Sequence, residues 1–408
     1  MFHSLSLEET ISLLHIDNNK IIADFDNLKN SEIVKKTNNK YYNIDNTFAI
    51  VNLPNDDNFY IIYTSEKREE YSILCQNINS NEEKKIGEHD EKITGFRSIY
   101  DEKNKRILLM SFSGKNNNVK LWETKDFEVW EQLLDIKKVN EKTRIISGCF
   151  INYQNNIYFL TSAKNLKKGE TIKGPEPIKV YDLEGNEIKD KKIPIESNVN
   201  FIDTFYHKKR KIYYVILGCG HSCKYYNYEN HDDNHSFEDS TQGFVKSVII
   251  DESRDIIIAL GLEHKTIMGW EFKSDNPALK FKISFGNKIN SIGTSLCIWD
   301  NKYVLVGIEK SVGIIDLSPL DKNEENENEE NEENEENEEN EEVEENEEKS
   351  QKKERSRLNN EDEKNKVKVI KILPCDNYIK TIKIIDKKYI VSQTYDETQK
   401  SRTILLWK

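Results

Sequence analysis

The sequence has few of the residues that mark extended proteins, and it has no long apolar run. Only 7 prolines and 16 glycines occur in 408 residues, which excludes collagen-like and proline-rich classes. No stretch of 18 apolar residues exists, so no membrane-spanning helix is expected. The first residues lack a basic segment followed by an apolar one, and the 6 cysteines are scattered. We therefore expect a reduced, intracellular location: the cytoplasm, with the nucleus as the alternative.

Motifs for nucleotide, hydrolase and metalloprotease chemistry are also missing. The sequence contains no G-x-x-x-x-G-K-S/T phosphate loop, no G-x-G-x-x-G opening a helix, no G-x-S-x-G nucleophile elbow and no H-E-x-x-H. The sequence therefore predicts a protein that is not an enzyme and that uses no cofactor.

One segment carries side chains that are able to bind zinc. Cys219, His221 and Cys223 occur within GCGHSCKYYN, over residues 218–227. Their C-x-H-x-C spacing is unusual for a structural site, and the segment also fits a strand, a turn and a second strand. Alternate residues of a strand point to opposite faces, so the two cysteines are expected on separate strands. We therefore expect no metal, with these three residues as the candidates if one binds.

The net charge of −13 belongs to a single segment. Residues 322–366 contain 21 acidic and 8 basic residues, whereas the rest of the chain has 52 of each. The segment begins with a nearly uninterrupted Asn-Glu-Glu repeat, which cannot bury enough apolar surface to offset the entropy of ordering. It is predicted to be a disordered acidic insertion, which either keeps the protein soluble or binds basic segments of a protein partner. The balanced remainder makes nucleic acid an unexpected ligand.

A pattern of about 45 residues repeats through the rest of the chain. Seven short segments alternate apolar residues, as VKLWE (119–123) and IKVYD (178–182) do. The fourth residues of these segments are the anchors of the repeat: Cys75, Trp122, Tyr181, Tyr226, Trp270, Ile315 and Trp407. Successive anchors are 47, 59, 45, 44, 45 and 92 residues apart, and removing the 45-residue insertion shortens the last interval to 47. The interval of 59 contains the polar stretch 165–177, which predicts an enlarged loop.

Each repeat contains several short strand candidates. In the second repeat they are residues 94–100, 106–112, 119–123 and 129–136, which are rich in Val, Ile, Tyr and Phe. Four strands in about 45 residues are typical of one blade of a β-propeller. The sequence therefore predicts an all-β fold, a seven-bladed β-propeller with four antiparallel strands in each blade.

These repeats resemble those of the WD-repeat β-propeller family. VKLWE and IKVYD occupy the place of the family's Trp-Asp ending, and IGEHDEKI (86–93) resembles its Gly-His start, with Glu88 inserted between Gly87 and His89. The resemblance implies that His89 and Trp122 belong to one structural hydrogen-bonded set, in which Asn116 replaces an acid. It also implies a non-catalytic scaffold or adaptor that binds proteins through its loops. The alternatives are a substrate receptor of a ubiquitin ligase, although no W-D-x-R ending occurs, and an enzyme with a site in the central channel.

The two ends of the chain are expected to meet in one blade. The last repeat ends at its third strand, so an N-terminal segment is expected to supply the fourth and close the ring. SEIVKKT (31–37) is the preferred candidate, and residues 21–25 are the alternative. The propeller then covers residues 31–408. Residues 1–30 form an N-terminal extension, in which Ser6 and Glu9 make a capping-box pattern for a short helix.

Overall fold

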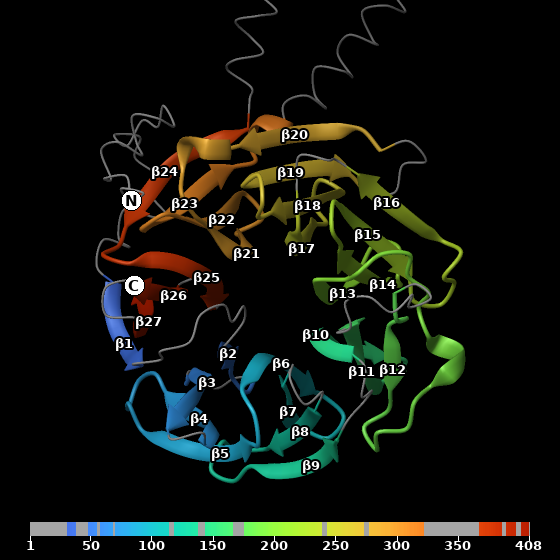
Figure 1. Cartoon of the computed structure of the whole chain (residues 1–408), viewed down its shortest axis with the longest axis vertical. Coiled ribbons are helices and arrows are strands. Elements are labelled where there is room, and N and C mark those ends of the chain that lie inside the picture. The colour runs from blue at the N-terminus through green and yellow to red at the C-terminus, as the bar shows by residue number, and fades with distance from the viewer. Residues whose placement is uncertain are drawn as a thin grey trace, which may run out of the picture.

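Seven antiparallel β-sheets surround a common centre in the computed structural model (Figure 1). The structure describes residues 31–37, 48–54, 58–67, 70–113, 118–137, 143–165, 175–238, 243–272, 277–321, 367–385, 389–396 and 401–407. The predicted N-terminal extension 1–30 and the predicted insertion 322–366 lie outside these residues. In the part of the chain that is described, no helix is long and apolar enough to cross a membrane.

Five blades consist of four consecutive strands each, with the first strand nearest the centre (Figure 1). Blade 1 contains β2 (Phe48–Val51), β3 (Tyr60–Lys67), β4 (Glu70–Asn77) and β5 (Glu83–His89). Blade 2 contains β6 (Ile93–Asp101), β7 (Arg106–Ser113), β8 (Asn118–Thr124) and β9 (Glu131–Ile136). Blade 4 contains β13 (Phe201–His207), β14 (Ile212–Gly218), β15 (Ser222–Asn227) and β16 (Asn234–Glu238). Blade 5 contains β17 (Val245–Asp251), β18 (Ile256–Gly261), β19 (Thr266–Glu271) and β20 (Leu279–Ser284). Blade 6 follows the 3-10 helix η2 (Gly286–Lys288) and contains β21 (Ile292–Trp299), β22 (Tyr303–Ile308), β23 (Ser311–Asp316) and β24 (Lys368–Pro374).

Blade 3 departs from the four strands that the repeat predicts. It contains only β10 (Thr143–Tyr153), β11 (Asn156–Asn165) and β12 (Lys179–Tyr181). After β12 the chain returns along this strand through two isolated bridges, Ile178–Ile193 and Tyr181–Glu187, with the 3-10 helix η1 (Lys189–Lys191) between them. Pro194 follows immediately and cannot donate a hydrogen bond to a strand ladder, so a regular fourth strand is disfavoured here.

Blade 7 is built from segments that are far apart in the sequence. Its strands are β25 (Tyr378–Ile385), β26 (Tyr389–Asp396), β27 (Ser401–Trp407) and β1 (Ser31–Thr37), in that order across the sheet. β1 pairs antiparallel with β27, and Ser31 lies opposite Trp407. The alternative closing segment, residues 21–25, lies outside the described part of the chain.

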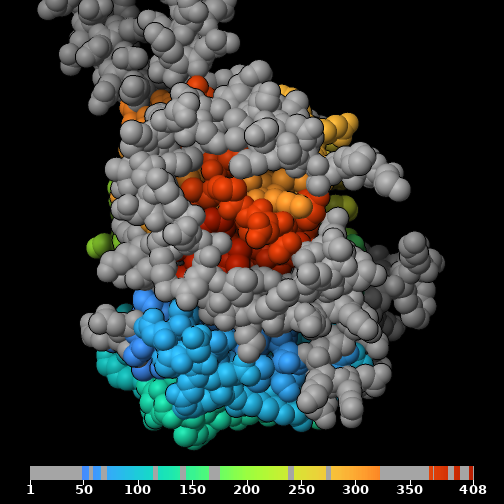
Figure 2. Space-filling model, turned by 90° about the vertical axis from the view of Figure 1, so that its left-hand side faces the viewer, coloured from blue at the N-terminus to red at the C-terminus, as the bar shows by residue number. Residues whose placement is uncertain are grey.

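A hydrophobic cluster fills each interface between neighbouring blades. The described residues form seven such clusters, and each cluster draws its members from two adjacent blades. The cluster between blades 7 and 1 includes Phe48 and Tyr63 together with Val391 and Leu406. Blade 7 (red) and blade 1 (blue) both face the viewer in Figure 2. Seven interfaces complete a ring, so the prediction of a seven-bladed propeller is confirmed.

The direction of the strands gives the ring two different faces, because neighbouring strands of each blade run antiparallel. We call the face that carries the connections between successive blades the crossover face. It also carries the turns between the second and third strands of each blade. The opposite face, here the hairpin face, carries the turns between the first and second strands. The chain leaves the described part at Asp321, after β23, and re-enters it at Val367, before β24, both on the hairpin face.

Candidate functional site

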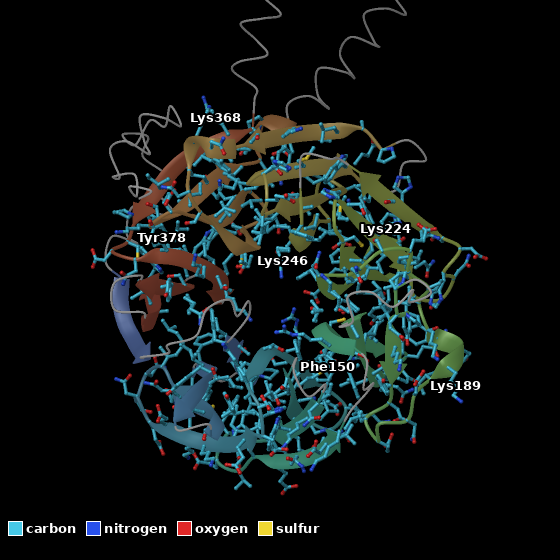
Figure 3. The ribbon with its side chains drawn as sticks, in the orientation of Figure 1. Phe150, Lys189, Lys224, Lys246, Lys368 and Tyr378 are labelled. Carbon is cyan, nitrogen blue, oxygen red and sulfur yellow. The ribbon has the colours of Figure 1, made fainter. Side chains whose placement is uncertain are left out.

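The innermost strands of the blades are not regular along their whole length. These strands are β2, β6, β10, β13, β17, β21 and β25, and five of them shift register near their beginning, toward the crossover face. Bulges of this kind re-aim a side chain at the rim of a closed sheet. In β17 and β25 the shifts occur at Lys246 and Lys380. Lys246 lies at the inner edge of blade 5, beside the ring centre (Figure 3).

Serine hydroxyls tie neighbouring inner strands to one another. In three blade pairs, a serine of one inner strand accepts a backbone N–H from the next blade. The bonds run from Ile202 N to Ser147 Oγ at 3.3 Å, from Leu296 N to Ser247 Oγ at 3.0 Å and from Ile382 N to Ser295 Oγ at 2.8 Å. Buried hydrogen bonds between blades fix the spacing of the inner strands, so side chains at the centre have a rigid support.

Basic residues outnumber acidic ones on the inner strands. The seven strands contain five basic residues, namely Arg97, Arg144, Lys246, Lys380 and Lys383. They contain three acidic residues, and two of these end their strands and pair with arginines: Asp101 with Arg106 at 2.9 Å, and Asp251 with Arg254 at 2.7 Å. The third is Asp203, which lies in the middle of β13. The inner strands therefore give the ring centre a positive charge.

Strand register places three of these charged groups at comparable levels of the ring. Arg97 lies four residues before Asp101, the last paired residue of β6, and Asp203 lies four residues before His207, the last of β13. Lys383 lies two residues before the end of β25. Side chains two or four residues apart on a strand point to the same face of the sheet. Arg97, Asp203 and Lys383 therefore each point to the same side as the last paired residue of their strand, so their orientations are equivalent in the three blades.

The charges of Arg97 and Lys383 act on each other across the ring. Burial and, to a smaller extent, the positive charge of Arg97 together lower the pKa of Lys383 to about 8, while Cys297 and Asp203 act in the opposite direction. These residues belong to blades 2, 7 and 4, which are not neighbours, so their charges meet only at the ring centre. All three side chains are half-buried and therefore still reach solvent. We call Arg97, Asp203 and Lys383 the central cluster.

Two thiols lie beside the central cluster. Cys149 is buried on β10, and Cys297 on β21 donates to the Ile382 carbonyl at 3.0 Å. Burial raises the pKa of the Cys297 thiol to about 12 and that of Cys149 well above its ordinary value. Both thiols are protonated at neutral pH, so neither is an activated nucleophile.

The anchors of the repeat all lie on the third strand of their blade and are buried. Six of them, from Trp122 to Trp407, pack in the cluster that their blade shares with the preceding blade. Cys75 instead packs toward blade 2, and its neighbour Leu74 packs toward blade 7. A shift of one residue along a strand turns a side chain to the other face of the sheet. In blade 1 the residue that corresponds to the other six anchors is therefore Leu74, one residue before Cys75.

His89 and Trp122 are joined through a third residue, Ser111, which the sequence analysis did not name. The Trp122 indole donates to Ser111 Oγ at 2.8 Å, and Ser111 Oγ lies 2.7 Å from His89 Nε2. Burial lowers the pKa of His89 to about 3, with a smaller contribution from the charge of Lys120, so the imidazole is neutral. Blade 7 repeats part of this arrangement, since Trp407 donates to Ser392 Oγ at 2.9 Å. Asn116 lies outside the described residues.

The three zinc candidates are separated by burial. Cys219 and Cys223 are buried on either side of the turn between β14 and β15, whereas His221 is exposed in that turn. Burial raises the pKa of both cysteines, which disfavours the thiolates that zinc requires. Within the described ranges, no group of three or more His, Cys, Asp or Glu side chains is arranged to hold a metal ion.

Comparisons with known proteins identify the fold but not a family. No protein-family model matches the chain, and no curated protein matches it in sequence. Solved structures are similar: Raptor from Chaetomium thermophilum has a TM-score of 0.57 at 10% identity, over 92% of this chain and 29% of the Raptor chain. This protein has a WD-repeat-like β-propeller fold.

Two further structures match along nearly their whole length. BBS1N, solved in complex with ARL6DN, has a TM-score of 0.55 at 7% identity, over 93% of this propeller and 97% of that chain. A chain of the Mitotic Checkpoint Complex has a TM-score of 0.57 at 10% identity, over 95% and 98%. Identities this low establish the fold alone. The propeller spans less than a third of Raptor, so nothing of that protein's activity follows from the match.

Proposed function

We propose that this propeller is a non-catalytic scaffold or adaptor that binds a protein partner through its crossover face. The observation that carries this proposal is Phe244, whose side chain is 51% exposed at the connection from blade 4 to blade 5. Exposed aromatic side chains on a fixed backbone are typical anchors of protein interfaces.

The backbone around Phe244 is held on both sides. The Phe244 carbonyl accepts the Leu262 N–H at 3.0 Å, and the next residue, Val245, donates to the Cys219 carbonyl at 3.0 Å. Both partners lie in turns between second and third strands, on the same face. The backbone that carries the Phe244 side chain is therefore fixed before any partner arrives, which reduces the entropy lost on binding.

Basic side chains accompany Phe244 on this face. Arg144 is exposed at the start of β10, and Lys246 lies two residues after Phe244. A partner that presents an apolar side chain flanked by carboxylates fits this combination, because complementary charge guides orientation and accelerates association.

Quantitative affinity capture tests the proposal. The full chain, a Phe244→Ser variant and a Tyr206→Ser variant serve as baits, and captured proteins are compared by mass spectrometry. Tyr206 is a matched control, because it is 41% exposed near the hairpin-face end of β13. We expect proteins that are lost with Phe244→Ser and kept with Tyr206→Ser. Capture that depends on Tyr206 alone, or on neither residue, contradicts the use of this face.

We also propose that the acidic residues 322–366 attract a basic segment of the partner and that binding takes place in the cytoplasm. Attraction of this kind raises the association rate and falls steeply with salt. Association rates of a captured partner, measured over a salt series for the full chain and for a deletion of 322–366, test this role. Equal salt slopes remove the segment from binding.

A further inference from the structure

We propose that Arg97 and Lys383 form a binding site for a tetrahedral oxyanion of the phosphate class at the ring centre. This inference goes beyond the proposed protein-binding function. It does not depend on the identity of a protein partner.

Arg97 and Lys383 are two cations at comparable levels of the inner strands, and neither has a close counter-ion in the described part of the chain. Among the described residues, no carboxylate lies within 4.0 Å of the side-chain nitrogens of Arg97 or Lys383. By contrast, Asp101 and Asp251, which end two of the inner strands, are each paired with an arginine. The charge that acts most strongly on Lys383 is the like charge of Arg97. The like charges of Arg97 and Lys383 repel each other, and an anion bound between them offsets this repulsion.

Arg97 and Lys383 each make one contact that orients the side chain. The Arg97 guanidinium donates to its neighbouring Phe96 carbonyl at 2.9 Å, which fixes its orientation while leaving other N–H groups for a ligand. Lys383 Nζ lies 5.3 Å from the centroid of the Phe48 ring, in the blade between blades 2 and 7. A planar guanidinium on one side and a compact ammonium on the other match the several oxygens of a tetrahedral anion.

Asp203 sets the total charge of the site. One of its oxygens accepts the Thr204 N–H at 2.8 Å, which keeps part of the carboxylate engaged in blade 4. Two cations and one carboxylate leave a net charge of +1, and the thiols of Cys149 and Cys297 add no negative charge. Lys246 and Lys380 lie further toward the crossover face and make that approach positive. Positive charge along the approach raises the local concentration of anions.

The ionisation of Lys383 predicts how affinity depends on pH. An anion stabilises the charged ammonium, so the protein binds it best when Lys383 is protonated. With a pKa of about 8 in the free protein, Lys383 loses its proton as the pH rises above that value. Sulfate keeps its charge over this range, so any change in its affinity comes from the protein. Sulfate affinity is therefore expected to fall above about pH 8.

Calorimetric titration of sulfate and of inorganic phosphate into the full chain, at constant ionic strength, tests the site. Replacing Arg97→Gln or Lys383→Met is expected to weaken binding about tenfold or more, because each removes a charge-assisted contact. Arg144→Gln is the matched control and is expected to change affinity less than about twofold, because this exposed arginine lies outside the central cluster. Competition by phosphoserine shows whether the site also accepts a phosphoryl group that belongs to a larger ligand.

Conservative variants keep the test decisive if a neutral variant does not fold. Lys383→Arg retains the charge but does not titrate near pH 8, so it is expected to bind sulfate with no loss above that pH. Arg97→Lys is expected to bind more weakly than the unmodified chain and more tightly than Arg97→Gln. The inference is overturned if the unmodified chain shows no saturable binding of either anion. It is also overturned if Arg144→Gln weakens binding as much as Arg97→Gln does.

Discussion

Arg254 holds Asp321 through two contacts, at the point where the chain leaves the described part of blade 6. Arg254 Nε lies 2.7 Å from Asp321 Oδ1, and Nη2 donates to Oδ2 at 2.8 Å. The same guanidinium pairs with Asp251 at 2.7 Å, so it links blade 5 to the end of the segment that follows β23. The described structure is therefore held in place at Asp321, directly before residue 322.

Deletion of residues 322–366, with a short linker between Asp321 and Val367, is expected to leave the melting temperature nearly unchanged. Long surface insertions add little to the entropy of loop closure. Scanning calorimetry of both chains checks this. A fall of more than about 5 °C, which corresponds to a kcal/mol or more for a domain of this size, shows instead that the segment packs on the ring.

The pairing of β1 with β27 leads us to propose that residues 31–37 close the ring. Deleting residues 1–37 removes the backbone partner of β27 and exposes a sheet edge, so we expect a lower unfolding midpoint and aggregation. Deleting residues 1–30 keeps β1 and is expected to have little effect. Denaturation of the two truncated chains side by side separates these outcomes, and equal stability contradicts the proposed closure.

Gly87 and Trp122 are in contact across the interface of blades 1 and 2. A Cβ atom at Gly87 lies only 2.2 Å from Cη2 of the Trp122 ring, so Gly87→Ala forces the ring to move. Overpacking of this kind costs about 1–3 kcal/mol of unfolding free energy. Gly220→Ala is the matched control, because a Cβ atom there meets nothing within 4 Å. Chemical denaturation is expected to show a loss for Gly87→Ala alone, and equal losses contradict this packing.

His89 is expected to make stability depend on pH in a defined direction. Its pKa is about 3 in the folded protein and about 6.5 when unfolded, so the unfolded chain binds the extra proton. The contribution is complete above pH 6.5 and is lost as the pH falls from 6.5 toward 3. Between pH 7.5 and 5 this loss is about 2 kcal/mol, because one pKa unit corresponds to about 1.4 kcal/mol.

Urea denaturation at both pH values compares the unmodified chain with His89→Gln and with His221→Gln. We expect a smaller loss of stability on acidification for His89→Gln, and an unchanged loss when the exposed His221 is replaced. The assignment is wrong if the two variants respond to acid in the same way.

The repeat could be predicted from the sequence because third strands carry large apolar residues at a regular spacing. Trp122, Trp270 and Trp407 mark this spacing, since an interface between blades needs a large side chain at that position. The position in blade 1 was harder to assign, because Leu74 and Cys75 are both apolar and only strand register separates them. The missing strand of blade 3 depends on tertiary packing, although Pro194 was a signal.

The central cluster could not be predicted in the same way. Arg97, Asp203 and Lys383 occur in strands separated by more than a hundred residues, and only the closed ring brings their charges together. An available signal was that each charged residue lies in the interior of a strand that is rich in apolar and aromatic residues. Phe244 gave no signal at all, because exposure depends on how the surrounding turns are arranged.

Hydrogen–deuterium exchange on the propeller, with and without a captured partner, tests the central claim most directly. The account predicts slower exchange at residues 243–246 and 262–265 of the crossover face when the partner is bound. It predicts unchanged exchange at residues 208–211 and 252–255 of the hairpin face. Protection of the hairpin-face segments alone contradicts the account.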